Sequence, residues 1–152
     1  QPRARLILVG SGPAQQALQA RQPAAVFCGS RTGAFLAEHY ASGDLFLFPS
    51  LTETYGNVVA EALASGLPVV AYRDAAAQEL IEHRVHGWLA EPGDEAAFIA
   101  GALALAEAPE LRARQRLAAR ERVASLAWQA IVERLVTLQR QVILSSPVSA
   151  RR

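Results

Sequence analysis

Residues 48–70 read FPSLTETYGNVVAEALASGLPVV and contain a strand end, a turn, a helix and a second strand start. The run at 45–48 is apolar without alternation, and the run at 68–72 has the same character. Between them, residues 57–65 have a helical pattern that Gly66 closes. Two continuous apolar strands joined by a helix predict a parallel strand–helix–strand unit.

The same alternation covers the first two thirds of the chain. Further strands are predicted at 6–9, 26–28 and 87–89, and further helices at 14–21, 31–42 and 75–82. Continuous apolar strands are typical of a sheet buried on both faces, so the sequence predicts an α/β, Rossmann-like, doubly wound parallel sheet. Such sheets bind ligands beyond the carboxyl ends of their strands, where the turns after Val9, Cys28, Phe48 and Tyr72 lie.

The last third is predicted to be helical, at 94–107, 109–126 and 127–144, followed by a tail at 145–152. Asp94 is the expected N-cap of the first of these helices. The last helix has an apolar stripe, for which we expect either packing on its own domain or a dimer contact. The stripe comprises Trp128, Ile131, Leu135, Leu138 and Val142. The middle helix is rich in arginine, and a solvated basic face is favoured there over a lipid contact; its arginines are Arg112, Arg114, Arg116, Arg120 and Arg122.

Composition excludes several classes of protein. The 152 residues, with 51% hydrophobic and 19% charged side chains, suit one globular domain. The net charge of +1 gives no global field for nucleic acid, and no apolar run approaches the roughly 20 residues of a membrane span. The single cysteine, Cys28, is expected to be a small buried hydrophobe. All 15 basic residues are arginine, so any mechanism that needs a lysine is incomplete in this chain.

Two glutamates flank the turn in the opening stretch. Gly56 permits a sharp bend, and Asn57 is the expected N-cap of the helix, whose first-turn N–H groups would form an anion site for a phosphate. Glu61, one turn further in, could accept both hydroxyls of a ribose, and Glu53 could accept hydroxyls of a group on the far phosphate. On the residues alone, a solvated helix position for Glu61 and a plain loop position for Glu53 remain equally open.

Two other patterns are weaker. Gly10-Ser11-Gly12 follows a strand as in a dinucleotide fingerprint, but Gln15 replaces the third glycine, so a tight turn is favoured. His83 and His86 could share a helix face with a metal, yet no third ligand is evident. Polar surface positions and C-terminal capping are favoured for both histidines, and no metal site is predicted.

The opening stretch also closely resembles the core motif of retaining GT-B-fold glycosyltransferases of group 1, the family 4-like mannosyl- and glucosyltransferase type. That motif is E-x-(F/Y)-G, a second glutamate after seven intervening residues, and A-x-A-x-G-x-P-V-V. Its positions here are Glu53, Tyr55, Gly56, Glu61, Ala62, Ala64, Gly66, Pro68, Val69 and Val70. The runs LILVGSGP, VFCGS and GDLFLFPS extend the resemblance over nearly the whole chain, as the C-terminal, donor-binding domain of such an enzyme.

The resemblance implies a nucleotide-diphospho-sugar donor, with UDP, GDP and ADP left open, and transfer of a hexose to a lipid or glycan acceptor with retention. It implies that Glu61 holds the ribose and that Glu53 holds the donor sugar and is catalytic. The backbone of Gly56, Asn57 and Val58 would meet the diphosphate, with Tyr55 in the same turn, and Gly29 and Ser30 would lie near the base; these residues are the expected nucleotide site. The resemblance implies neither a bound metal nor another cofactor.

The sequence departs from the family pattern at its start, which is similar to the family's second strand. The first strand and the following loop, which carries an Arg and a Lys that stabilise the leaving diphosphate, are expected to be missing, as is the acceptor domain. We therefore expect residues 1–126 to be a donor-binding fragment that is inactive alone, and 127–144 to pack toward the absent domain. A non-catalytic nucleotide-binding scaffold is the alternative, ahead of an epimerase or phosphorylase. The single cysteine excludes a disulfide within the chain and fits a reducing compartment, so a cytoplasmic protein is expected. Peripheral contact with the inner membrane face and homodimerisation through the last helix are left open.

Overall fold

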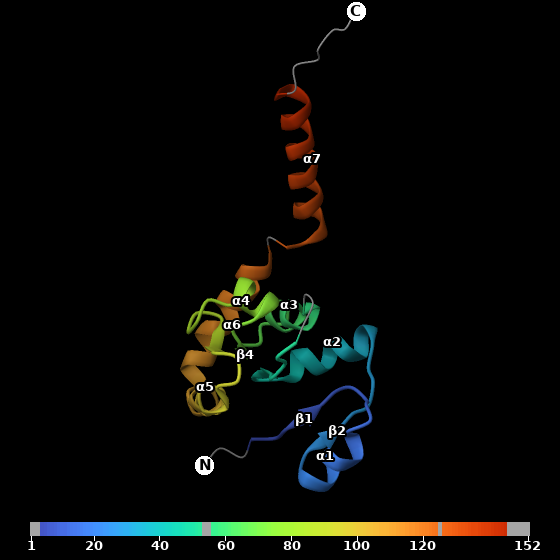
Figure 1. Cartoon of the computed structure of the whole chain (residues 1–152), viewed down its shortest axis with the longest axis vertical. Coiled ribbons are helices and arrows are strands. Elements are labelled where there is room, and N and C mark those ends of the chain that lie inside the picture. Colours follow the sequence, from blue (N-terminus) through green and yellow to red (C-terminus); the bar gives the residue numbers. More distant parts are fainter. Residues whose placement is uncertain (1–3, 53–55, 125, 146–152) are drawn as a thin grey trace, which may run out of the picture.

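The computed structural model describes residues 4–52, 56–124 and 126–145, apart from the side chains of Ala75 and Trp128. Strands and helices alternate and three helices end the chain (Figure 1). The elements are β1 (Ile7–Leu8), α1 (Gln15–Arg21), β2 (Val26–Phe27), α2 (Gly33–Ser42), β3 (Phe46–Phe48), α3 (Asn57–Ala64), β4 (Val69–Tyr72), α4 (Ala75–Leu80), β5 (Gly87–Ala90), α5 (Glu95–Glu107), α6 (Pro109–Ala124) and α7 (Trp128–Ser145). All of the predicted elements are present, with ends shifted by a few residues.

Every strand pairing is parallel, as predicted, but the strands form two sheets. β1 pairs with β2, and β4 pairs with β3 on one side and β5 on the other. The β3–β4 register places Phe46 opposite Val69, and the β4–β5 register places Val69 opposite Gly87. α2 connects the two sheets, and no strand among the described residues lies between β1 and β3.

Among the described residues, β1 and β3 each have one edge without a strand partner. The carbonyls of Leu6 and Leu8 accept hydrogen bonds from β2, so the backbone groups of Ile7 point to the other side of β1. Phe46 donates to Pro68 at the start of β4, so the backbone groups of Leu47 likewise point away from β4. β1 and β3 therefore each have a free hydrogen-bonding edge among the described residues.

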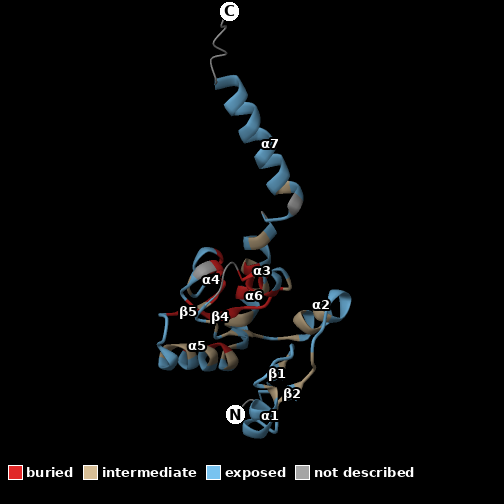
Figure 2. Cartoon of the chain, turned by 45° about the vertical axis from the view of Figure 1, so that its right-hand side comes forward, coloured by how far each residue is buried: buried red, intermediate tan, exposed pale blue. Residues whose placement is uncertain are grey.

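Burial differs sharply between the sheets (Figure 2). All four residues of β4 are buried, as expected of a strand covered on both faces. Ile7 of β1 and Val26 of β2 are 47% and 44% exposed although their composition is the same. Phe35 of α2 is 67% exposed. The β1–β2 sheet thus has the apolar composition of buried strands, but its side chains are partly exposed to solvent.

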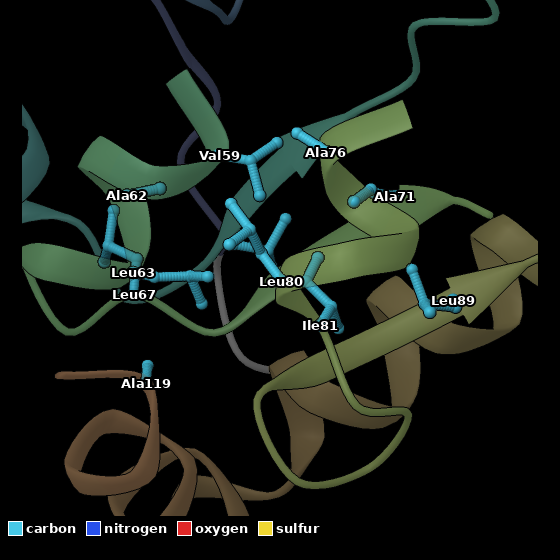
Figure 3. Packing of buried hydrophobic residues seen from close by; sticks show 12 residues of the cluster. Val59, Ala62, Leu63, Leu67, Ala71, Ala76, Leu80, Ile81, Leu89 and Ala119 are labelled. Atoms are coloured by element: carbon cyan, nitrogen blue, oxygen red, sulfur yellow. The ribbon is translucent and has the colours of Figure 1, made fainter. Parts of the chain in front are cut away.

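The core lies between β4 and helices α3, α4 and α6 (Figure 3). Val59 and Leu63 of α3 and Ala119 of α6 are fully buried. Ile81, the residue after the end of α4, belongs to the same cluster. Side chains three or four residues apart share a helix face, which explains why one stripe of α3 is buried while Glu61 is exposed. This packing fixes α3 on the three-stranded sheet.

Two glycines allow close approach in this layer. A Cβ on Gly87 would lie 2.0 Å from the carbonyl oxygen of Val69 in the adjacent strand. A Cβ on Gly101 would lie 2.3 Å from Cδ1 of Trp88, so α5 packs against β5 through the Trp88 indole. Neither contact leaves room for a side chain.

Four arginines of α6 bind the C-terminal ends of four other helices, which corrects the prediction of a merely solvated basic face. Arg112, Arg116, Arg120 and Arg122 each donate to a carbonyl oxygen in or just after a last helical turn. The acceptors are Leu105 and Ala106 of α5, Gly43 after α2, Ser65 after α3, and Glu79 and Leu80 of α4. The carbonyls of a last helical turn have no hydrogen-bond partner within the helix, and they carry the negative end of the helix dipole. A guanidinium group supplies both the missing donors and a compensating positive charge.

The connection from α4 to β5 contains both histidines of the predicted surface pair. Nδ1 of His86 accepts from the N–H of Glu82, and Nδ1 of His83 accepts from the N–H of Leu89. His86 is 7% exposed, so the surface prediction is wrong for it. Burial and then the nearby Arg84 and Arg73 charges lower the pKa of His83.

Arg122 and Gln115 of α6 act on this connection. Burial and then the positive charge of Arg122 lower the pKa of His86, while the charge of Glu82 opposes this shift. Gln115 of α6 is 2% exposed and donates to the carbonyl of Arg84, whose φ of 69° is a turn conformation. The two histidines and Gln115 therefore hold this turn in place through backbone hydrogen bonds.

The last helix, α7, extends away from the rest of the molecule (Figure 1). Packing on its own domain, one of the two expected arrangements, is therefore not observed. Leu135, Leu138 and Val142 are at least half exposed.

Asp94 caps α5 as predicted, by accepting a hydrogen bond of 2.9 Å from the N–H of Ala97. None of the described helices is both long and apolar enough to cross a membrane.

Candidate functional site

The site begins where α3 starts, beyond the carboxyl end of β3. Gly56 is the N-cap of α3, with φ 71° and ψ 52°, and is itself buried. Asn57, predicted as the cap, is instead the first helical residue. A residue with a Cβ adopts the left-handed conformation of Gly56 only at an energetic cost, which explains why glycine and not Asn57 occupies the cap position.

The first turn of α3 has free donors. The N–H of Val59 is bonded to the carbonyl of Gly56, while those of Asn57 and Val58 bond to no other described residue. No side chain of a described residue caps this helix, and its first turn contains no acidic residue. Free amides at the positive end of a helix dipole make a site suited to an anion such as a phosphate.

Glu61 lies one turn further along α3 and is exposed. Its Oε2 accepts a hydrogen bond of 3.1 Å from the hydroxyl of Tyr40, near the end of α2. Burial and then the charge of Glu61 raise the pKa of Tyr40 to about 12, so the phenol stays a donor at neutral pH. The second carboxylate oxygen, Oε1, has no protein partner among the described residues.

Tyr40 is held from the other side by aromatic packing. Its ring meets Phe46 edge to face at 5.7 Å, and Phe46 stacks on Phe48 at 6.1 Å. These rings connect α2 to β3, so Tyr40 is fixed relative to the strand that leads into the site. Nothing in the sequence spacing ties Tyr40 to Glu61, which lies 21 residues further along the chain.

Gly29 and Ser30 follow β2, at the carboxyl end of the other sheet. Gly29 has φ 67° and accepts a hydrogen bond from the N–H of Gly10, which follows β1. This bond continues the parallel pairing of β1 and β2 beyond the ends of both strands. Ser30 is exposed, and Cys28 is half-buried rather than fully buried as expected.

The structure thus brings Gly56, Asn57, Val58 and Glu61 together on α3 and adds Tyr40 to them. Gly29 and Ser30 instead lie at the carboxyl end of β2, in the separate β1–β2 sheet. Glu53 and Tyr55, the remaining predicted site residues, lie outside the described residues. Within the described part of the chain, no three His, Cys, Asp or Glu side chains are grouped so that they could hold a metal ion.

A family model described as "Glycosyl transferases group 1" matches residues 1–108. A GDP-mannose-dependent alpha-mannosyltransferase of Mycobacterium tuberculosis is 39% identical over 132 residues, which are 87% of this chain and 34% of that protein. A sulfoquinovosyl transferase of Arabidopsis thaliana is 37% identical over 88% of this chain and 27% of its own length. The chain therefore spans about a third of the length of the curated relatives it matches.

Solved structures agree on the fold. A sucrose-phosphate synthase from Thermosynechococcus elongatus matches with a TM-score of 0.81 and 28% identity, over 95% of this chain and 40% of that one. The Anabaena protein HepE, solved in complex with UDP, matches with a TM-score of 0.68 and 30% identity, over 90% of this chain and 42% of that one. These neighbours are GT-B glycosyltransferases, in agreement with the α/β fold of parallel strands. The chain belongs to the glycosyl transferases of group 1.

Proposed function

We propose that this chain is the donor-binding part of a retaining glycosyltransferase that transfers a hexose from a nucleotide-diphospho-sugar to a lipid or glycan acceptor. The observation that carries the proposal is the start of α3, where the N–H groups of Asn57 and Val58, which have no partner among the described residues, lie one turn from the exposed carboxylate of Glu61. A diphosphate at the helix end and a ribose diol on the carboxylate fit this arrangement. HepE, about 30% identical, was solved with UDP and with UDP-glucose.

Roles for the other residues follow the family motif. Glu53 would bind the donor sugar, Tyr55 would contribute to the turn, and Gly29 and Ser30 would lie near the base. No metal or other cofactor is needed for this scheme. Matched relatives use GDP-mannose and a matched structure holds UDP, so both nucleotides are candidates.

Calorimetry with UDP, GDP and ADP tests nucleotide binding directly. We expect one of the three to bind with a 1:1 stoichiometry, and Glu61→Ala to weaken that binding by at least tenfold, since a carboxylate–diol contact is charge-assisted. Glu95→Ala, which alters an exposed carboxylate at the start of α5, is the matched control and should leave the affinity unchanged. Absence of binding by all three nucleotides would reject the proposal.

We further propose that the 152 residues act within a longer polypeptide and that a strand from outside them fills the space between β1 and β3. In the doubly wound order 3-2-1-4-5-6, β2, β1, β3, β4 and β5 take the places of strands 3, 2, 4, 5 and 6, which leaves the first position vacant. The free edges at Ile7 and Leu47, and the exposed apolar side chains of β1, support this arrangement.

Amide hydrogen exchange tests the strand. The amides of Ile7 and Leu47 should exchange rapidly in the 152-residue chain and become protected in a longer version extended before Gln1. The amide of Phe46, bonded to Pro68, is the internal control and should be protected in both. Rapid exchange of Ile7 and Leu47 in the longer version would show that no strand is added there.

The isolated chain should not transfer sugar, because no lysine is present to stabilise the leaving diphosphate. Incubation with nucleotide sugars and a broad acceptor set should give no product, and turnover by the chain alone would contradict this.

In a longer, active version, NMR of the product should show that the transferred sugar keeps the anomeric configuration that it has in the donor. For α7, a contact with another domain or with a second copy is proposed, in a protein of the cytoplasm or the inner membrane face.

A further inference from the structure

We infer that Tyr40 is a positioning residue for Glu61, and that it makes the proposed nucleotide site selective for ribose over deoxyribose. The inference rests on the proposed function, which assigns the ribose to Glu61, and it concerns a residue outside the glutamate motif. Its basis is the hydrogen bond of 3.1 Å from the Tyr40 hydroxyl to Oε2 of Glu61, between helices α2 and α3.

An exposed glutamate on a helix normally samples several rotamers. In α3 only one of its two oxygens is engaged, because Tyr40 holds Oε2 and Oε1 has no protein partner among the described residues. The carboxylate therefore has one oxygen fixed and one available as an acceptor. A ligand that donates a hydroxyl to Oε1 meets a carboxylate that is already oriented, so less entropy is lost on binding.

The directions of the two helices agree with this role. α2 and α3 each precede a strand of the same parallel sheet, so both begin at the carboxyl edge and run away from it. Side chains of helices lean toward the N-terminus, so Tyr40 and Glu61 both lean toward the ligand edge. Tyr40 supports the carboxylate from α2, and the first turn of α3 lies beyond it.

The phenol is suited to hold this bond. Tyr40 is packed on Phe46, which restricts its ring. Its pKa of about 12 keeps the proton on the phenol through the physiological range, so the hydroxyl donates and the carboxylate accepts. A neutral donor fixes Glu61 without neutralising its charge, which an arginine in the same place would do.

The experiment is calorimetry of the full 152-residue chain with the nucleoside diphosphate that binds most tightly and with its 2′-deoxy and 3′-deoxy analogues. Tyr40→Phe removes only the hydroxyl. We expect it to weaken ribonucleotide binding by about threefold to tenfold and to change binding of the deoxy analogue that has lost the Glu61 contact by less than twofold. In a Glu61→Gln background the effect of Tyr40→Phe should shrink, because the two residues act together.

Tyr72→Phe is the matched control, since it removes a hydroxyl from the other described tyrosine, whose ring packs on Phe98. It should leave the ratio of ribose to deoxyribose affinities unchanged. An equal loss for ribo- and deoxynucleotides in Tyr40→Phe would mean a merely structural role and overturn the inference, as would unchanged affinity for all of them. If the wild type binds with a dependence on Glu61 and Tyr40→Phe has no effect, only this inference fails; if the wild type binds no nucleotide, the proposed function and this inference fail together.

Discussion

Nε of Arg122 in α6 lies 3.1 Å from the carbonyl oxygen of Leu80, at the end of α4, 42 residues earlier in the chain. Nη2 of the same side chain donates to the carbonyl of Glu79. One guanidinium group thus closes the C-terminus of a helix that belongs to the core layer.

Replacing Arg122 by alanine should lower the free energy of unfolding by about 1–2 kcal/mol, because two last-turn carbonyls lose a charged donor. Urea denaturation measures the change. Arg114→Ala is the control, since Arg114 is exposed on the same helix and should cost less than about 0.5 kcal/mol. Equal losses for the two variants would show that the helix-end contacts contribute nothing specific.

Gly87→Ala should prevent stable folding of the three-stranded sheet or cost more than about 4 kcal/mol, because its Cβ would lie 2.0 Å from the carbonyl oxygen of Val69. Gly12→Ala, in open space, is the comparison and should be close to neutral. Circular dichroism during thermal unfolding distinguishes the two. A Gly87→Ala protein as stable as the wild type would mean that β4 and β5 are not paired as described.

Acidification should destabilise the protein through His83 and His86, whose pKa values are lowered in the folded state. The unfolded chain, with histidines near pKa 6.5, then binds more protons than the folded chain, so stability falls as the pH drops below about 6.5. Protonation of either Nδ1 would also break its hydrogen bond from the backbone.

Urea midpoints at pH 7.5 and 5.5 test this dependence. His86→Gln, which keeps an acceptor without a titrating group, should reduce the difference between the two midpoints. An unchanged difference in the variant would remove His86 as a cause. Between pH 7.5 and 8.5, the two histidines should contribute no slope.

Truncation after Leu126 should leave the stability of the α3–β4 core unchanged to within about 0.5 kcal/mol, because α7 extends away from the body (Figure 1). Removing α7 should also increase the solubility of the chain, since its exposed leucines and valines form an apolar face. Urea denaturation and sedimentation measure the two effects. A truncated chain that unfolds at a much lower urea concentration would show that α7 does support the core.

Much of the fold was predictable because the signals are local. Continuous apolar runs predicted each strand, and Gly66 marked the end of α3. The cap of α3 was misassigned because Asn57 and Gly56 are both favourable in that region, and backbone conformation chooses between them. In the site, the Glu61 position was predicted and its partner Tyr40 was not.

Local signals in the sequence specify parallel strands, helices and the glycine turn that leads into α3. Periodicity and turn chemistry act over a few residues, so these features need no distant partner. Three features come from tertiary packing: the edges of β1 and β3 that have no strand partner among the described residues, the contact of Arg116 with Gly43 across 73 positions, and the contact of Tyr40 with Glu61 across 21. Such contacts depend on how layers pack in space, and no local spacing specifies which side chains that packing brings together.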